Sequence, residues 1–168
     1  ADHARLSVGI VAENSPGVYA QYCLAGMSQD DPVGNSVTRN RKSNTKCIVL
    51  LASDGTVDAE ATAEVITDGV RLTWTDFPAT AVLVTIEMRT GSDLSVYAGD
   101  FLASANVETD TVVTDPNFQI DQMIVLGNAR NNNWDTTNTG CFMQVGFADR
   151  GAPIAQCSHG WTQSDAAT

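Results

Sequence analysis

One passage of this sequence occurs twice, and no other feature limits the possible folds as strongly. Tyr19–Asp31 reads YAQYCLAGMSQDD, and Ile154–Asp165 reads IAQCSHGWTQSD. The segments that precede them also match, because Ala4–Glu13 (ARLSVGIVAE) and Cys141–Asp149 (CFMQVGFAD) share Val-Gly, one or two apolar residues, Ala and an acid. A match over two consecutive segments indicates an internal repeat.

The repeat has the length of a domain. Gly146 follows Gly9 by 137 positions, and later matching pairs are 135 and 134 positions apart, so two short contractions account for the drift. A period this long is too large for one unit of a solenoid. We therefore predict one repeat over residues 1–134 and the first quarter of a following repeat over residues 135–168. The alternative is that residues 135–168 supply strands that complete the same sandwich.

Strand patterns dominate the chain. In GVRLTWT, Val70, Leu72 and Trp74 alternate with polar residues, which predicts a strand with these three side chains on its buried face. The preceding TDG predicts a tight hairpin turn, with Ala63–Ile66 as the partner strand. A short helical turn could start Asp58–Ile66, which is rich in helix formers.

About ten short strands separated by turn residues favour an all-β fold, an antiparallel β-sandwich or jelly roll. The other strands that we expect are Leu6–Ala12, Val18–Leu24, Cys47–Leu51, Val82–Met88, Leu94–Leu102, Thr109–Thr114, Met123–Leu126, Phe142–Phe147 and Ile154–Ser158.

The charge balance argues against polyanionic partners. The chain has 20 acidic and 9 basic residues, a formal net charge of −11. Nucleic acids and anionic membranes would be repelled, so we expect neither as a partner. The longest apolar run, Cys47–Ala52, is far shorter than the ~20 residues that span a bilayer.

No arrangement of residues predicts catalysis. The two histidines, His3 and His159, offer little material for a triad or a metal site, and we expect no catalytic residue, no metal and no cofactor. Adjacent Asp30 and Asp31 would point to opposite faces of a strand, which suits a solvated turn better than paired acid catalysis.

The four cysteines show no CxxC spacing. Cys23 and Cys157 occupy matching positions of the repeat on apolar-rich strands. We expect both to be small buried hydrophobic residues, with a disulfide as the second interpretation.

A tryptophan in a polar loop is the main candidate for ligand binding. Trp134 lies within ARNNNWDTTNTG, where an exposed indole beside amide and hydroxyl groups could stack on a sugar ring or a protein partner. The interpretation that we favour is that it folds back over a sheet edge or packs on the next repeat. The candidate contact residues are Trp134, Asn131, Asn132, Asn133, Asp135, Asp30, Asp31 and Asn35.

One basic cluster stands out in the acidic chain, in the sequence RNRK. Arg39, Arg41 and Lys42 could contact an acidic neighbouring subunit, although such a run is usually a solvated loop, which we favour. Phe142 and Ile154, in the second copy of the repeat, complete the candidates for inter-repeat or intersubunit contact.

The order of motifs from Asp68 onward resembles a repeat found in virion structural proteins of tailed bacteriophages. That repeat has a DGF-x-L-x-W strand, then a GG-x-DL-x-x-x-VG-x-F strand, then a strand that opens the following unit. The matching residues here are Asp68, Gly69, Leu72, Trp74, Gly91, Asp93, Leu94, Gly99, Phe101, Phe118 and Met123–Leu126. The chain departs from the pattern where Val70 replaces Phe, Thr-Gly replaces Gly-Gly and Gln119–Asp121 lacks a Pro.

The resemblance implies a β-sandwich module of a fibre, spike or decoration protein on the virion surface, and it carries no catalytic residue. We expect neighbouring virion subunits, including copies of the same chain, as partners, and contact with a host surface. Two alternatives stay open. One is a carbohydrate-binding module of an adhesin that recognises a host glycan, and the other is a subunit of an extracellular filament built by strand exchange through residues 141–168.

Overall fold

The computed structural model describes residues 3–29, 37–103, 110–127, 133–151, 153 and 155–163. These residues form an all-β protein and include no helix, hence none that could span a membrane. Its strands are β1 (His3–Ser15), β2 (Val18–Gln29), β3 (Val37–Ser43), β4 (Ile48–Leu51), β5 (Val57–Ile66), β6 (Gly69–Asp76), β7 (Gln122–Gly127), β8 (Thr137–Thr139), β9 (Cys141–Asp149) and β10 (Ala155–Gln163).

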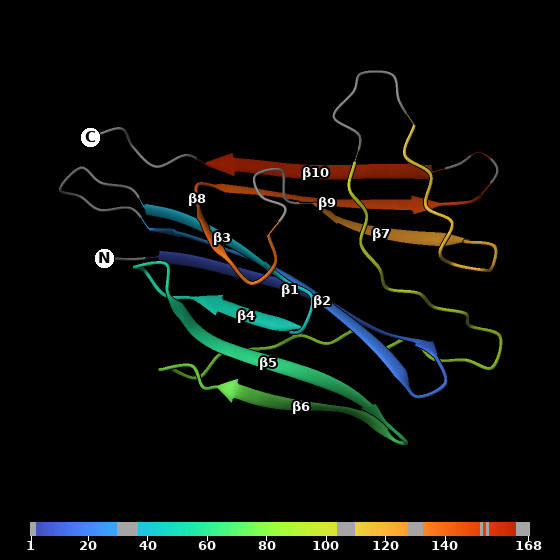
Figure 1. Ribbon diagram of the computed structural model, residues 1–168, viewed down its shortest axis with the longest axis horizontal. Helices are drawn as coiled ribbons and strands as arrows, with labels where there is room; N and C mark the ends of the chain where they lie inside the picture. The colour runs from blue at the N-terminus through green and yellow to red at the C-terminus, as the bar shows by residue number, and fades with distance from the viewer. Residues whose placement is uncertain are drawn as a thin grey trace.

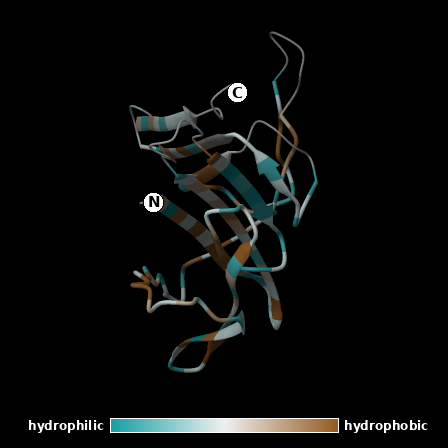
Figure 2. Cartoon of the chain, turned by 90° about the vertical axis from the view of Figure 1, so that its left-hand side faces the viewer, coloured by the Kyte–Doolittle hydropathy of each residue, from teal (hydrophilic) through white to brown (hydrophobic). Residues whose placement is uncertain are grey.

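The strands form three antiparallel sheets that lie in layers. Sheet A has the order β1-β2-β3-β8, sheet B the order β4-β5-β6 and sheet C the order β10-β9-β7. In Figure 1, sheet A lies between sheet C above and sheet B below. Hydrophobic and hydrophilic residues alternate along the strands (Figure 2), as expected when successive side chains point to opposite faces. The predicted all-β sandwich is confirmed.

Residues Cys23–Met27 of β2 are buried on both faces because this part of the strand lies at the centre of the stack. On one face, Cys23, Ala25 and Met27 pack against Val49 and Leu51 of β4, and all five side chains are buried. Burying a side chain as large as Met or Leu stabilises the fold by about 1.5–3 kcal/mol. This cluster is therefore expected to provide most of the stabilisation between sheets A and B.

The opposite face of β2 joins sheet A to sheet C. Leu24 packs against Met143 of β9, and both are buried. Leu126 of β7 and Trp161 of β10 pack around this pair. The contact is smaller than that with sheet B, and part of sheet C extends beyond it.

Both copies of the sequence repeat form antiparallel hairpins, β1–β2 in sheet A and β9–β10 in sheet C. Their registers place the cysteines differently. Cys23 lies opposite Gly9, whereas Cys157 lies opposite Phe147, one position beyond Gly146. A change of one residue moves a side chain to the other face of a sheet, so the two cysteines do not have equivalent surroundings.

The predicted TDG hairpin is confirmed. Ile66 pairs with Gly69 across a two-residue turn between β5 and β6. Val70, Leu72 and Trp74 are half-buried and the residues between them are exposed, which confirms the alternation. Trp74 is not a core residue, however, because β6 is at the edge of sheet B.

Three predicted strands are wrong. Val82–Met88, Leu94–Leu102 and the described part of Thr109–Thr114 are outside every strand, although the first has a clear alternating pattern. A strand needs a neighbour that accepts and donates its backbone hydrogen bonds, and none pairs with them in the described part of the chain. The helical start of Asp58–Ile66 is also wrong, because pairing with β4 and β6 on both sides makes this segment a strand.

Candidate functional site

Residues 133–140 lie along β3 and are held there by backbone contacts. Asp135 N donates to the Lys42 carbonyl at 2.9 Å, and Gly140 N donates to the Thr38 carbonyl at 2.9 Å. Between these points, β8 pairs with β3. The Trp134 loop is therefore positioned by the strand that contains the basic cluster.

Trp134 is half-buried against sheet A in an aromatic and basic contact. The Lys42 ammonium lies 4.4 Å from the centre of the indole, a cation–π distance. The Tyr22 ring lies 5.7 Å from the indole with an interplanar angle of 52°. The structure thus joins two sets of residues that the sequence presented separately, the Trp134 loop and the RNRK cluster. We call Tyr22, Lys42 and Trp134 the aromatic cluster.

The Tyr22 hydroxyl connects the aromatic cluster to a carboxylate. Its hydroxyl donates to Asp100 Oδ1 at 3.3 Å. Partial burial, followed by the nearby negative charge of Asp100, raises the pKa of Tyr22. The phenol acts as a hydrogen-bond donor at the edge of the cluster. Tyr22 and Asp100 gave no sequence signal, since they are far from Trp134 in the chain.

The basic cluster is part of a strand, so the prediction of a solvated loop is wrong. Arg41 is directed toward sheet B, where its guanidinium lies 3.4 Å from Glu60 Oε1 and 3.8 Å from Asp135 Oδ1. Lys46 Nζ lies 3.3 Å from the other Glu60 oxygen. Asp135 adopts a positive φ of 56°, a conformation that Asp tolerates better than most residues. Arg41 therefore connects sheets A and B to the Trp134 loop.

Arg39 also faces sheet B and crosses the turn before β5. Its Cγ lies 2.8 Å from the position that a Cβ on Gly55 would occupy. Gly55 has a φ of 86°, so both its conformation and the space that Arg39 takes favour glycine there.

Several sequence candidates lie outside the described residues: Asp30, Asp31, Asn35, Asn131, Asn132 and Ile154. Phe142 belongs to β9, and its side chain is also outside the described part. Asn133 is exposed next to Trp134.

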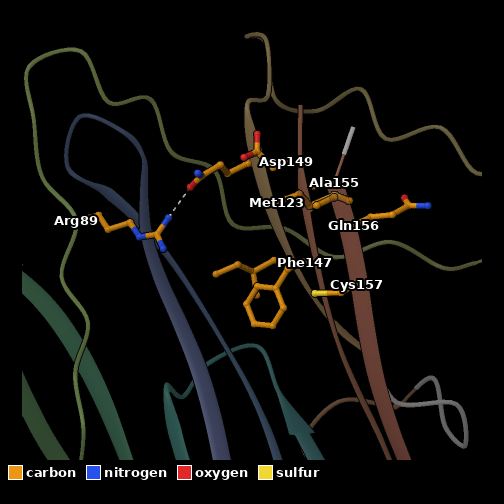
Figure 3. A pocket seen from close by; sticks show the side chains of 10 residues that line it. Arg89, Met123, Phe147, Asp149, Ala155, Gln156 and Cys157 are labelled. Carbon is orange, nitrogen blue, oxygen red and sulfur yellow. Dashed lines mark hydrogen bonds between the residues drawn. The ribbon is translucent and has the colours of Figure 1, made fainter. Parts of the chain in front are cut away.

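Sequence reasoning missed a cleft at the end of sheet C. Its volume is about 390 Å³. Phe147 and Cys157 point into it, and Arg89 lies across from them (Figure 3). The lining residues are Arg89, Gln122, Met123, Ile124, Phe147, Ala148, Asp149, Ala155, Gln156 and Cys157. Arg89 donates to Gln122 Oε1 at 2.9 Å, which ties the segment after β6 to this cleft.

The cleft explains why the prediction of a buried Cys157 is wrong. Cys157 is exposed, and its cross-strand neighbour Phe147 is 51% exposed. Both lie on the face of sheet C that turns toward sheet A, but at the end that extends beyond it. Cys23 is buried and free, and its sulfur lies 3.2 Å from the Ser7 hydroxyl.

The two places differ in the chemical groups that they present. In the described part of the chain, no group of three or more His, Cys, Asp or Glu residues is placed to hold a metal ion. In the aromatic cluster, the rings of Trp134 and Tyr22 lie together with the Lys42 ammonium, and the Asp100 carboxylate accepts a hydrogen bond from the Tyr22 hydroxyl. The cleft offers an apolar floor with an exposed arginine.

Comparisons with known proteins give no relative for this chain: no family model, no curated protein and no solved structure matches it.

Proposed function

We propose that this chain is a non-enzymatic structural module of a virion, from a tail fibre, spike or capsid decoration protein that assembles with copies of itself. Two features support the proposal. One is the resemblance of its motif order to the repeat of phage virion proteins, which the sequence carries from Asp68 to Leu126. The other is a group of exposed apolar side chains, which favours assembly.

Large apolar side chains are exposed in the segments that connect sheet B to sheet C. Phe77, Leu83, Met88, Leu102 and Val112 are between 64% and 96% exposed. Scattered exposed apolar residues are ordinary in folded proteins. So many of them between β6 and β7 favour a surface that another molecule covers.

Light scattering combined with native mass spectrometry over a wide concentration series tests the assembly. We expect species that are multiples of the 17.8 kDa chain. A monomer at every concentration would overturn the proposal of self-assembly. The virion role has its own test, which is mass spectrometry of purified virus particles from the source material. Peptides of this chain should be enriched in the particle fraction, and their presence only in the non-particle fraction would contradict the role.

A carbohydrate-binding function is the second candidate, and the aromatic cluster favours it. Sugar rings stack on indole and phenol faces while adjacent polar groups bind the hydroxyls. Here Trp134 and Tyr22 are 5.7 Å apart, with Asp100 bonded to the Tyr22 hydroxyl. The Lys42 ammonium occupies part of the indole surface, so a ligand would have to share or displace that contact.

A glycan array with three proteins tests this candidate. Wild type and a Trp74→Phe control, altered on a distant strand, should bind the same glycans, and Trp134→Ala should bind none. Circular dichroism of each protein would show whether the variants keep the fold. Absence of binding by wild type, or equal binding by Trp134→Ala, would remove the carbohydrate function.

A further inference from the structure

Strand β6 has one open edge. It pairs with β5 on one side, and no strand in the described part of the chain pairs with its other side. One face of β6 carries the half-buried Val70, Leu72 and Trp74, and its other face carries the exposed Arg71, Thr73 and Thr75. An edge strand of this length with unpaired N–H and C=O groups is a template for another strand.

The segment Val82–Met88 has the pattern of a strand but no strand partner. Val82, Val84, Ile86 and Met88 alternate with Leu83, Thr85 and Glu87, and every one of these residues is exposed. No backbone hydrogen bond joins Thr80–Arg89 to the rest of the described chain. A segment with high β-propensity, exposed apolar groups and unpaired backbone is suited to pairing between molecules.

The side chains of this segment complement those of β6 in one antiparallel register. Placing Val84 opposite Trp74 puts Ile86 opposite Leu72 and Met88 opposite Val70, all on the apolar face. The same register puts Glu87 opposite Arg71 and Thr85 opposite Thr73 on the polar face. Aromatic–β-branched pairs, Thr–Thr pairs and opposite charges are the favourable cross-strand combinations. A shift by one residue would place apolar side chains opposite polar ones.

Within one chain, the segment is held away from its own β6. At its end, Arg89 donates to Gln122 in sheet C, the layer on the other side of sheet A from β6. Further along, the Asn14 side chain exchanges two hydrogen bonds of 2.8 Å with the backbone of Ala98, at the β1–β2 turn. In Figure 1, the chain leaves the end of β6 and crosses behind the sheets toward β7.

We propose that Val82–Met88 of one copy adds as an antiparallel strand to the open edge of β6 in a second copy. The exchange is reciprocal, so that two copies form a two-fold dimer in which sheet B of each gains a fourth strand from its partner. This inference rests on the self-assembly proposed above and identifies β6 and Val82–Met88 as the surfaces in contact.

Charge reversal tests the register. Glu87→Arg places two cations opposite each other at both symmetric contacts, so the dimer Kd should rise by roughly tenfold. Arg71→Glu should weaken the dimer similarly, and the double variant Arg71→Glu/Glu87→Arg should restore it toward the wild-type Kd. Asp93→Arg, an equal charge change in the same connecting segment but outside the register, is the control and should leave the Kd unchanged. Sedimentation velocity over a concentration series gives these constants.

Cysteine cross-linking distinguishes a second copy from the same chain. In a Cys157→Ser background, Arg71→Cys and Glu87→Cys are made in separate chains, mixed and oxidised. A disulfide between positions 71 and 87 of different chains is the expected result. Both substitutions are also made together in one chain. A 71–87 disulfide within a monomer of that variant would overturn the proposal in favour of an intramolecular strand.

The remaining outcomes separate this inference from the proposed function. Oligomers that persist in Glu87→Arg and give no 71–87 cross-link would overturn the β6 contact while leaving self-assembly in place. Wild-type protein that stays monomeric at every concentration would overturn both.

Discussion

Gly9 in β1 lies directly against the backbone carbonyl of Cys47, the residue before β4. A Cβ on Gly9 would be 1.8 Å from that oxygen, far inside any contact distance. Gly146, the matching glycine of the second hairpin, has the Cβ of Val125 as its nearest neighbour, at 3.7 Å from the position of a Cβ. The same repeat position therefore lets sheet B approach sheet A in the first copy, whereas in the second copy a Cβ would make only ordinary van der Waals contacts.

The two glycines should respond differently to the same substitution. Gly9→Ala forces β4 away from β1 and should lower the free energy of unfolding by about 3 kcal/mol, near the upper end for overpacking. Gly146→Ala makes only ordinary contacts, at 3.7 Å or more, and should raise it by about 0.5 kcal/mol, because glycine in a strand costs conformational entropy. Urea denaturation of both variants measures the difference. Equal effects would contradict the close approach at Gly9.

Glu60 should contribute more to stability than other charged residues on sheet B. Its carboxylate lies between Arg41 and Lys46, and all three side chains are only 16–18% exposed. Glu60→Gln leaves two cations poorly paired in a partly buried place, and we expect a loss of about 1–3 kcal/mol.

Glu64→Gln is the matched control for that loss. Glu64 pairs with Arg71 at 3.0 Å, but the two side chains are 55% and 61% exposed. Solvent screening reduces such a pair to about 0–1 kcal/mol. Denaturation curves should therefore show a larger loss of unfolding free energy for Glu60→Gln than for Glu64→Gln. Equal losses would mean that the ion pairs of Glu60 stabilise the protein no more than an exposed pair does.

Local patterns predicted the elements that depend on neighbours in sequence. The β5–β6 hairpin follows from TDG between two alternating segments, and β2 follows from an apolar run. In both cases the information lies within about a dozen residues. The two copies of the repeat each form an antiparallel hairpin, although their registers differ by one position.

The errors involve partners that are distant in sequence. Arg41 is inside the structure because Glu60 is placed to receive it, and RNRK alone contains no sign of this. Cys157 is exposed because its end of sheet C extends beyond sheet A, which the repeat could not reveal. The strand pattern of Val82–Met88 is real, but a strand also requires pairing with an edge, and periodicity does not show whether its own chain or another copy supplies that edge.

The buried thiols should make stability depend on alkaline pH. Burial raises the pKa of Cys23 to about 11 from an ordinary value of 9.0, and burial also raises the pKa of Cys47. Between pH 9 and 11 the unfolded chain loses the Cys23 proton while the folded chain keeps it. The free energy of unfolding should therefore fall over this interval, by about 2–3 kcal/mol for Cys23.

Cys23→Ala provides the comparison for this pH dependence. The variant starts from a lower stability because it leaves a small cavity beside Val49 and Leu51. Its free energy of unfolding should nevertheless fall less steeply than that of wild type between pH 9 and 11. Parallel curves for the two proteins would mean that Cys23 is accessible to solvent and titrates normally in the folded state.

Thiol labelling at neutral pH should separate the cysteines that the repeat makes equivalent in sequence. Cys157 is exposed, whereas Cys23 and Cys47 are only 3% and 5% exposed. Iodoacetamide should modify Cys157 at least ~100-fold faster than either buried thiol, because those react only after the sheets separate. Peptide mapping at successive times follows each site, and Cys157→Ser shows whether the rapid reaction is lost. Rapid labelling of Cys23 would contradict the packing of β2 on β4, since that contact is what protects it.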